Sequence, residues 1–314
     1  MLQALSKAMF SVLADSVVLK KIASRYGMRR ERSFARRFVA GETMEELVAA
    51  VRALEAQRLE TTLDHLGERV TDREAALSAA LDYAEVMKAA AAAGISRNVS
   101  VKLTQIGLDI DRATCIDNLR RVLEAAREVG GFVRIDMEDS SYTSDTLDAF
   151  ETLWKIGYTN MGVVIQSCLR RSPEDVRRMN RLGARIRLVK GAYSEPRDIA
   201  YHRKQDVDQA FVALMEVLLT DGHYPAIATH DPAMIDATLA FAAAKHLPRT
   251  AFEFQLLYGL RRDLRRQLVA KGCPVRVYVP FGKEWFPYFM RRLGERPANI
   301  AFVLKSLGRE DPDR

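Results

Sequence analysis

Residues 132–167 read FVRIDMEDSSYTSDTLDAFETLWKIGYTNMGVVIQS, and they contain one complete repeat of the pattern that decides the fold. A short apolar run, Phe132–Met137, is followed by a helix-like stretch that Gly157 can end, and then by a second apolar run, Val163–Ser167. A strand, a helix and a second strand in this order are typical of a βαβ unit, in which the two strands are parallel.

The same alternation covers the chain from residue 58 onward. Strand-like runs are spaced roughly 23 to 40 residues apart, which is the size of a βα unit. There are eight of them: Glu60–Leu66, Val99–Leu103, Phe132–Met137, Val163–Ser167, Ile186–Val189, Ala226–Thr229, Phe252–Phe254 and Val275–Val279. Eight units predict an α/β protein with a (β/α)8 TIM-like barrel. A doubly wound open sheet is the alternative, which the absence of Gly-x-Gly-x-x-Gly after the early strands weakens.

Local signals mark the ends of the predicted helices. Thr71-x-x-Glu74 predicts a capping box at the start of one helix. A glycine follows each of several helical runs, where a left-handed residue would end the helix. These glycines are Gly94, Gly130, Gly157, Gly183, Gly222 and Gly272.

The chain before the first strand shows helical periodicity and no strand signal. One apolar stripe comprises Met44, Leu47, Val48, Val51 and Leu54. We therefore expect an N-terminal helical segment at residues 1–57, a catalytic barrel at 58–307 and a flexible polar tail at 308–314.

Composition excludes several classes of protein. The 314 residues are 48% hydrophobic and 28% charged, which is ordinary for a globular chain and unlike a disordered or collagenous one. No stretch approaches the roughly 18 uncharged apolar residues of a membrane span. The three cysteines are widely spaced and form no metal-binding pattern, so we expect no metal site and a reducing, cytoplasmic location.

The net charge of +7 leaves nucleic acid, an anionic membrane surface or an acidic ligand as partners. Basic residues are spread along the chain without aromatic interleaving, so we expect no nucleic-acid binding. Docking on an anionic membrane surface remains an alternative use of this charge.

Charged and polar residues keep the phase of the predicted strands. Side chains in alternate positions share one face of a strand, and a charged residue in a barrel strand is costly unless it faces the lumen or the catalytic end. The phased sets are Ser100, Lys102 and Thr104; Arg134, Asp136 and Glu138; Arg185 and Arg187; Glu253 and Gln255; and Arg276 and Tyr278. Structural ion pairs between barrel layers would explain some of them. Active sites of barrels lie at the carboxyl ends of the strands, so the set also predicts a site for an anionic ligand.

The sequence lacks the motifs of hydrolytic and metal chemistry, such as Gly-x-Ser-x-Gly and His-Glu-x-x-His. His230 follows the sixth strand-like run, where it is either a loop residue bonded to backbone or a ligand-binding group. A lyase or aldolase with Lys102 or Lys190 as a Schiff base is one alternative function, and a non-catalytic basic adaptor is another.

An ordered set of motifs closely resembles the proline dehydrogenase family. Each motif alone is weak, but their order and spacing match over most of the barrel. They are Leu63-Asp-His-Leu-Gly-Glu68, Ser100-Val-Lys-Leu103, Ile135-Asp136, Arg185-Ile-Arg-Leu-Val-Lys-Gly-Ala-Tyr193, Thr229-His230, Phe252-Glu-Phe-Gln255, Val277-Tyr-Val-Pro-Phe-Gly282 and Tyr288-Phe-Met-Arg-Arg-Leu-Gly-Glu-Arg-Pro-Ala-Asn299.

The resemblance implies a distorted (β/α)8 barrel with extra N-terminal helices and non-covalently bound FAD. It implies oxidation of L-proline to Δ1-pyrroline-5-carboxylate, the first step of proline catabolism to glutamate, by hydride transfer from C5 to flavin N5. Electrons would then pass to a membrane quinone, either ubiquinone or menaquinone, through a peripheral contact with the inner membrane.

The resemblance also implies roles for individual residues. Arg187 would lie near the reactive flavin N5, and Gln166 would contact the flavin ring. The remaining cofactor-binding residues would be Val189, Lys190, Gly191, Ala192, Thr229, His230 and Glu295. Arg291 and Arg292 would clamp the carboxylate of proline. Lys102, Asp136, Tyr278, Leu257 and Tyr288 would surround its ring.

Considered without the resemblance, Arg291 and Arg292 are an exposed helix pair, with Arg291 bridging Glu295 four residues on. Glu68 follows the first strand and would pair with Arg291 as a gate over the substrate. Two residues depart from the pattern of many relatives: Ser194 stands where they have Trp, and Asp231 where they have Asn. Both departures would fall near the AMP half of FAD.

Overall fold

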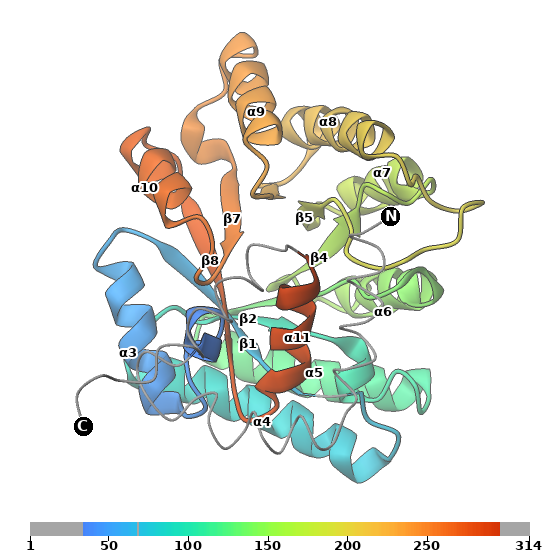
Figure 1. Ribbon diagram of the computed structural model, residues 1–314. Coiled ribbons are helices and arrows are strands. Elements are labelled where there is room, and N and C mark those ends of the chain that lie inside the picture. The colour runs from blue at the N-terminus through green and yellow to red at the C-terminus, as the bar shows by residue number, and fades with distance from the viewer. Residues whose placement is uncertain (1–33, 68, 296–314) are drawn as a thin grey trace.

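The computed structural model describes residues 34–67 and 69–295, and its strands close into a barrel (Figure 1). All eight strands are parallel and pair in sequence order, and β8 returns to pair with β1. The strands are β1 (Glu60–His65), β2 (Asn98–Val101), β3 (Phe132–Ile135), β4 (Met161–Gln166), β5 (Arg185–Val189), β6 (Ala226–Ala228), β7 (Glu253–Leu257) and β8 (Val275–Phe281). The predicted (β/α)8 barrel is confirmed, and each predicted run coincides with a strand to within a few residues.

Helices connect consecutive strands and surround the barrel, as Figure 1 shows for α4 to α10. The α-helices are α3 (Met44–Glu55), α4 (Arg73–Ala92), α5 (Arg112–Glu128), α6 (Thr143–Lys155), α7 (Ser172–Arg181), α8 (Lys204–Asp221), α9 (Pro232–Ala244), α10 (Arg262–Ala270) and α11 (Trp285–Glu295). Short 3-10 helices are η1 (Phe34–Arg37), η2 (Leu103–Ile106), η3 (Ser140–Tyr142) and η4 (Arg249–Ala251).

The helices bury one apolar face against the strands. On α5, Leu119, Val122, Leu123 and Ala126 are fully buried, at the spacing of one helix face. Burying one such leucine or valine side chain contributes about 1.5–3 kcal/mol. The outer layer therefore holds the strand ends, and the side chains on them, in fixed positions.

Most of the predicted helix ends are confirmed. Gly94, Gly130, Gly157, Gly183 and Gly272 all have positive φ at or just after a helix end. The prediction was wrong for Gly222, whose φ is −85°, because it leaves α8 in an extended conformation. The capping box was wrong by one residue: Asp72, not Thr71, caps α4, and its carboxylate accepts from the Ala75 N–H at 2.8 Å.

The segment before α3 is fastened to the carboxyl end of β8. The Ala40 N–H donates to the Pro280 carbonyl at 2.8 Å, and the Gly282 N–H donates to the Gly41 carbonyl at 2.9 Å. The indole N–H of Trp285, the first residue of α11, donates to Glu42 Oε1 at 2.8 Å. These contacts fix the start of α11 relative to the barrel.

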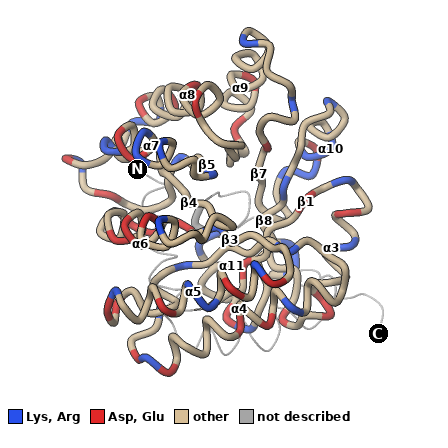
Figure 2. Tube along the Cα trace, turned by 180° about the vertical axis from the view of Figure 1, so that it is seen from behind, with Lys and Arg blue, Asp and Glu red and all other residues tan. Residues whose placement is uncertain are grey.

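Helix α3 occupies part of the predicted N-terminal helical segment. The predictions for residues 1–33 and for the tail at 308–314 lie outside the described residues. All three cysteines are buried and unpaired. Figure 2 shows acidic and basic residues interspersed along the outer helices. Among residues 34–67 and 69–295, no helix is both long enough and apolar enough to cross a membrane.

Candidate active site

Three predicted residues meet at the carboxyl ends of their strands. Lys102 follows β2, Asp136 follows β3, and Tyr278 lies on β8. The Lys102 ammonium lies 3.5 Å from Asp136 Oδ2 and 3.3 Å from the Tyr278 hydroxyl. The Tyr278 hydroxyl donates to Asp136 Oδ2 at 2.7 Å. Strand phasing placed these residues on inner faces at one end of the barrel, and the resemblance gave them a shared role; the structure joins them by direct contacts.

Arg187 of β5 binds the other oxygen of Asp136. Its Nη1 donates to Asp136 Oδ1 at 2.7 Å, its Nε to Gln255 Oε1 at 2.5 Å and its Nη2 to the Ser100 hydroxyl at 3.1 Å. Arg187 and Gln255 are both nearly inaccessible to solvent. The guanidinium is therefore held by three side chains from three different strands or strand ends.

The polar network continues toward the amino ends of the strands. The Gln255 amide donates to Glu253, and Glu253 accepts two hydrogen bonds from the Arg276 Nε and one from its Nη2 at 2.9–3.1 Å. Arg276 also donates to the Thr61 carbonyl at 2.8 Å. The lower charges of the strand-phased set tie neighbouring strands together, as the structural interpretation of the sequence expected. The upper ones lie at the carboxyl ends of the strands, where the sequence predicts a site.

Electrostatics keep Lys102 charged and Tyr278 neutral. Burial acts to lower the pKa of Lys102, but Asp64, Tyr278 and Asp136 more than offset it, so the pKa lies well above its ordinary value. Burial, together with Asp136 and Asp64, raises the pKa of Tyr278 well above its ordinary value. Lys102 is therefore a cation and Tyr278 a hydrogen-bond donor at neutral pH.

The loop after β5 approaches the end of β4 very closely. Gly191 has φ +112°, and a Cβ at this position would lie 2.4 Å from Cys168 Sγ and 3.3 Å from Gln166 Oε1. Gln166 itself donates from Nε2 to the Glu138 carbonyl at 2.9 Å. The Ser167 N–H binds the Val189 carbonyl at 2.8 Å, which ties the two strand ends together. Ala192, the next residue, is exposed.

Lys190 lies in a cluster of four charges. Its ammonium binds Asp208 on α8 and Asp231 Oδ2, the latter at 2.7 Å, and Lys204 binds the same two carboxylates. Burial acts to raise the pKa of Asp231, but the hydrogen bonds from Lys190 and Lys204 outweigh it and lower this pKa to about 2. Asp231, one of the two predicted departures from the family pattern, therefore has two lysine partners, Lys190 and Lys204.

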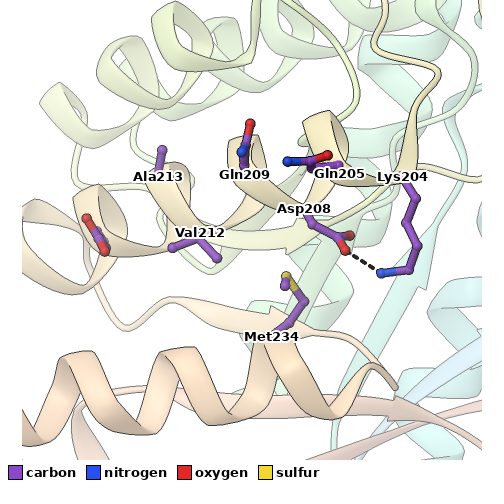
Figure 3. A pocket seen from close by; sticks show the side chains of 8 residues that line it. Lys204, Gln205, Asp208, Gln209, Val212, Ala213 and Met234 are labelled. Atoms are coloured by element: carbon purple, nitrogen blue, oxygen red, sulfur yellow. Dashed lines mark hydrogen bonds and ion pairs between the residues drawn. The ribbon is translucent and has the colours of Figure 1, made fainter.

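A groove of about 710 Å³ between α8 and α9 begins at this cluster (Figure 3). Asp208 and Lys204 stand at one end of the groove, and Val212 and Met234 form part of its apolar wall. Asp208 lines the groove and also binds Lys190, so the groove adjoins the loop after β5.

The ends of β6 and β7 are also joined at the site. His230 Nε2 accepts a hydrogen bond from the Leu257 N–H at 3.0 Å, so the imidazole proton of neutral His230 is on Nδ1. The Thr229 hydroxyl accepts from the Asp231 N–H at 3.1 Å. Both interpretations of His230 remain compatible with this contact.

Helix α11 carries Tyr288, Arg291 and Arg292. The Arg292 guanidinium lies 5.2 Å from the centre of the Tyr288 ring, and Arg291 is exposed. Burial raises the pKa of Tyr193, and the charges of Glu138, Lys102 and Arg291 also act on it. Glu68 and the side chain of Glu295 lie outside the described residues, and the gate and the Arg291–Glu295 pair stay predictions.

Sequence reasoning gave no role to two carboxylates that the structure brings into the site. Asp64 of β1 binds Lys102, and Asp208 of α8 binds Lys190. Asp64 alternates with Thr62 on its strand, which is the same signal that identified the other lumen residues. Asp208 lies on a helix surface, and no local signal distinguishes it from a solvated carboxylate.

A closed parallel barrel with charged side chains converging at the carboxyl ends of its strands is the architecture of a (β/α)8 enzyme. Residues 47–305 match the family model described as proline dehydrogenase. The chain is 41% identical to proline dehydrogenase 1 of Bacillus subtilis over 298 residues, covering 95% of this chain and 97% of that protein. It is 43% identical to proline dehydrogenase of Deinococcus radiodurans over 279 residues, covering 88% and 90%.

The chain therefore belongs to the proline dehydrogenase family. Among solved structures it is similar to proline utilization A (PutA) from Bdellovibrio bacteriovorus inactivated by N-propargylglycine, with a TM-score of 0.78 and 28% identity. The match covers 83% of this chain and 32% of that protein, so the chain spans about a third of the solved relative.

Proposed function

We propose that the protein is a flavin-dependent proline dehydrogenase that oxidises L-proline to Δ1-pyrroline-5-carboxylate. The observation that supports this most is the cluster of Lys102, Asp136, Tyr278 and Arg187 at the carboxyl ends of the strands, in a chain of this family. Such a cluster offers fixed charges and donors to a small zwitterionic substrate.

The residues after β4, β5 and β6 fit FAD. Gly191 has φ +112° and no side chain to cover its peptide groups, which lets a phosphate approach the backbone. Lys190 supplies a cation there, and Val189, Ala192, Thr229 and His230 lie on the same strand ends. We propose that these residues, with Gln166, Arg187 and Glu295, hold FAD, which when bound accepts the hydride that leaves C5 of proline.

The side chains have complementary tasks on the substrate. Arg291 and Arg292 would bind its carboxylate, since a guanidinium offers two parallel donors to a carboxylate. Lys102, Asp136 and Tyr278, with Leu257 and Tyr288, would bound the ring and fix its orientation. The amine must be neutral to release electrons as C5 loses hydride, so the rate should rise with pH. The chemistry requires no dedicated base, and we assign none.

Arg187 would favour the charge that arrives with the hydride. Its guanidinium is buried and already oriented by Asp136, Gln255 and Ser100, so it needs no rearrangement during reaction. The lyase alternative is disfavoured at Lys102, because its raised pKa keeps the amine protonated and non-nucleophilic.

For the electron acceptor, we propose a membrane quinone, ubiquinone or menaquinone, on the strength of the family resemblance. The net charge of +7 would favour peripheral docking of a cytoplasmic protein on anionic lipid, by about 1 kcal/mol for each well-placed cation. A soluble quinone analogue should reoxidise the reduced protein much faster than oxygen does. Faster reaction with oxygen would make the protein an oxidase.

The test of the proposed function is a turnover experiment with L-proline and a soluble quinone analogue. NMR should show loss of proline and one equivalent of Δ1-pyrroline-5-carboxylate for each quinone reduced. D-proline serves as the control for stereospecific binding. Absence of the imine product with FAD-loaded protein would refute the proposal.

A further inference from the structure

Asp64 is a buried carboxylate that the proposed chemistry leaves unused. It lies on β1, its side chain is 1% exposed, and its Oδ1 is 2.9 Å from the Lys102 ammonium. Its second oxygen, Oδ2, is buried and has no hydrogen-bond partner among residues 34–67 and 69–295. Lys102 is 23% exposed, so the lysine can reach a ligand in the mouth and Asp64 cannot.

A half-satisfied buried carboxylate is costly, because each buried polar atom without a partner loses its hydration. Unpaired groups of this kind are uncommon in folded proteins and call for an explanation. The ion pair that the structure gives Asp64 is with Lys102, so the effect of this carboxylate falls mainly on that ammonium.

The charges of the upper network balance in pairs. Lys102 and Arg187 are cations, and Asp64 and Asp136 are anions. Asp136 already binds Arg187 and the Tyr278 hydroxyl, and its contact with Lys102 is the longer one, 3.5 Å against 2.9 Å for Asp64. Without Asp64, Lys102 would keep only its longer carboxylate contact among residues 34–67 and 69–295, to Asp136, which Arg187 and Tyr278 already bind more closely.

We propose that Asp64 is a positioning residue: through its contact with Lys102 it holds the ammonium charged and in place beneath the substrate. This inference rests on the proposed function, since it is the binding of proline that Lys102 serves. Asp64 itself touches neither substrate nor cofactor.

The pH profile offers a readout that a purely structural role would not change. Asp64 comes first among the charges that hold the pKa of Lys102 up against burial. Its removal should bring that pKa down toward the working range, so that activity falls again at alkaline pH. The other groups that face Lys102 are Asp136, Glu138, Tyr278, Tyr83 and Tyr193.

The decisive variant is Asp64→Asn in the FAD-loaded enzyme. We expect kcat/KM for proline to fall about tenfold, and binding of cyclopentanecarboxylate, followed by the flavin absorbance, to weaken by about the same factor. The wild-type rate should rise with pH to a plateau, and the variant should add a descending alkaline limb. Glu60→Gln is the matched control, because Glu60 is a largely exposed carboxylate at the other end of the same strand.

Two further variants distinguish the proposed role from a defect in folding. Asp64→Glu keeps the negative charge but displaces it, so it should lower kcat/KM without adding a descending alkaline limb to the pH profile. Adding Asp64→Asn to Lys102→Met should change inhibitor binding less than about twofold, because the residue through which Asp64 acts is already gone. Wild-type behaviour of both Asp64 variants, or full additivity with Lys102→Met, would overturn the inference. Failure of the wild type itself to oxidise proline would instead refute the proposed function.

Discussion

Arg187 and Asp136 form an ion pair across the barrel lumen, with Nη1 and Oδ1 2.7 Å apart, and this pair joins β5 to the end of β3. It couples the residue expected beside the flavin to the residue expected beside the substrate. Asp136 also binds Tyr278 and Lys102, so loss of the arginine would not leave the carboxylate without partners.

Arg187→Met should therefore fold and bind FAD but reduce it at least about tenfold more slowly with proline, because a preorganised cation is removed from the place where negative charge arrives. Stopped-flow absorbance measures this rate. Arg185→Met is the control, since Arg185 lies two residues earlier on the same strand and stacks on Phe132 and Tyr224. Equal slowing in both variants would argue for a general effect on the barrel.

Arg291→Met and Arg292→Met should each raise the proline KM strongly, by about 2 kcal/mol or more of lost binding, because each removes a guanidinium from the substrate carboxylate. Steady-state kinetics and the FAD content of the purified variants measure the effect. Arg266→Met, an exposed arginine on α10, is the control. Normal proline binding in both α11 variants would show that these arginines are only an exposed helix pair.

Gly191→Ala should impair retention of FAD, because its Cβ would collide with Cys168 Sγ and would also strain a backbone at φ +112°. Gly94→Ala shares a positive φ but adds a Cβ with nothing within 4 Å, so it separates backbone strain from crowding at the site. We expect Gly94→Ala to lose about 1 kcal/mol of stability and to keep its FAD. Equal FAD content in the two folded variants would count against the assignment of this loop.

His65 should destabilise the protein in mild acid. Burial lowers its pKa, and Asp82 and Asp64 oppose this only partly. The folded state then binds the proton more weakly than the unfolded state does. The contribution of neutral His65 to the free energy of unfolding is therefore fully present above the unfolded pKa of about 6.5, and it declines as the pH falls below this value.

His65→Phe keeps the ring between Tyr83 and Phe281 and removes the titration. In urea unfolding, the free energy of unfolding should fall less steeply below pH of about 6.5 in this variant than in the wild type. His223→Gln, at an exposed position, is the control. Parallel curves for wild type and His65→Phe would rule out this role.

Much of the fold could be predicted because each βα unit carries its own signals. The alternation of Glu253 with Phe254, or of Arg276 with Val277, identified both the strand and its inner face, and the structure confirms it. The end of α8 could not be predicted from Gly222 alone. Its conformation depends on how the chain turns back into β6, and that is set by tertiary packing.

The sequence predicted which residues belong to the site better than it predicted which of them contact one another. Asp64 pairs in register with Ser100, two residues before Lys102, so the contact between carboxylate and ammonium follows from the stagger of the two strands. The link of Asp231 to Lys190 and Lys204 joins the end of β5, the start of α8 and the residue before α9. Sequence patterns report which face a residue occupies, and the barrel geometry decides what it meets there.

The central claim is that proline reduces a flavin held by this barrel, and an anaerobic absorbance titration tests it most directly. FAD-loaded protein should show the flavin absorption bands, released on denaturation, and stoichiometric L-proline should bleach them without oxygen present. A correctly folded protein that takes up no FAD, or whose bound FAD stays oxidised in excess L-proline, would contradict the account.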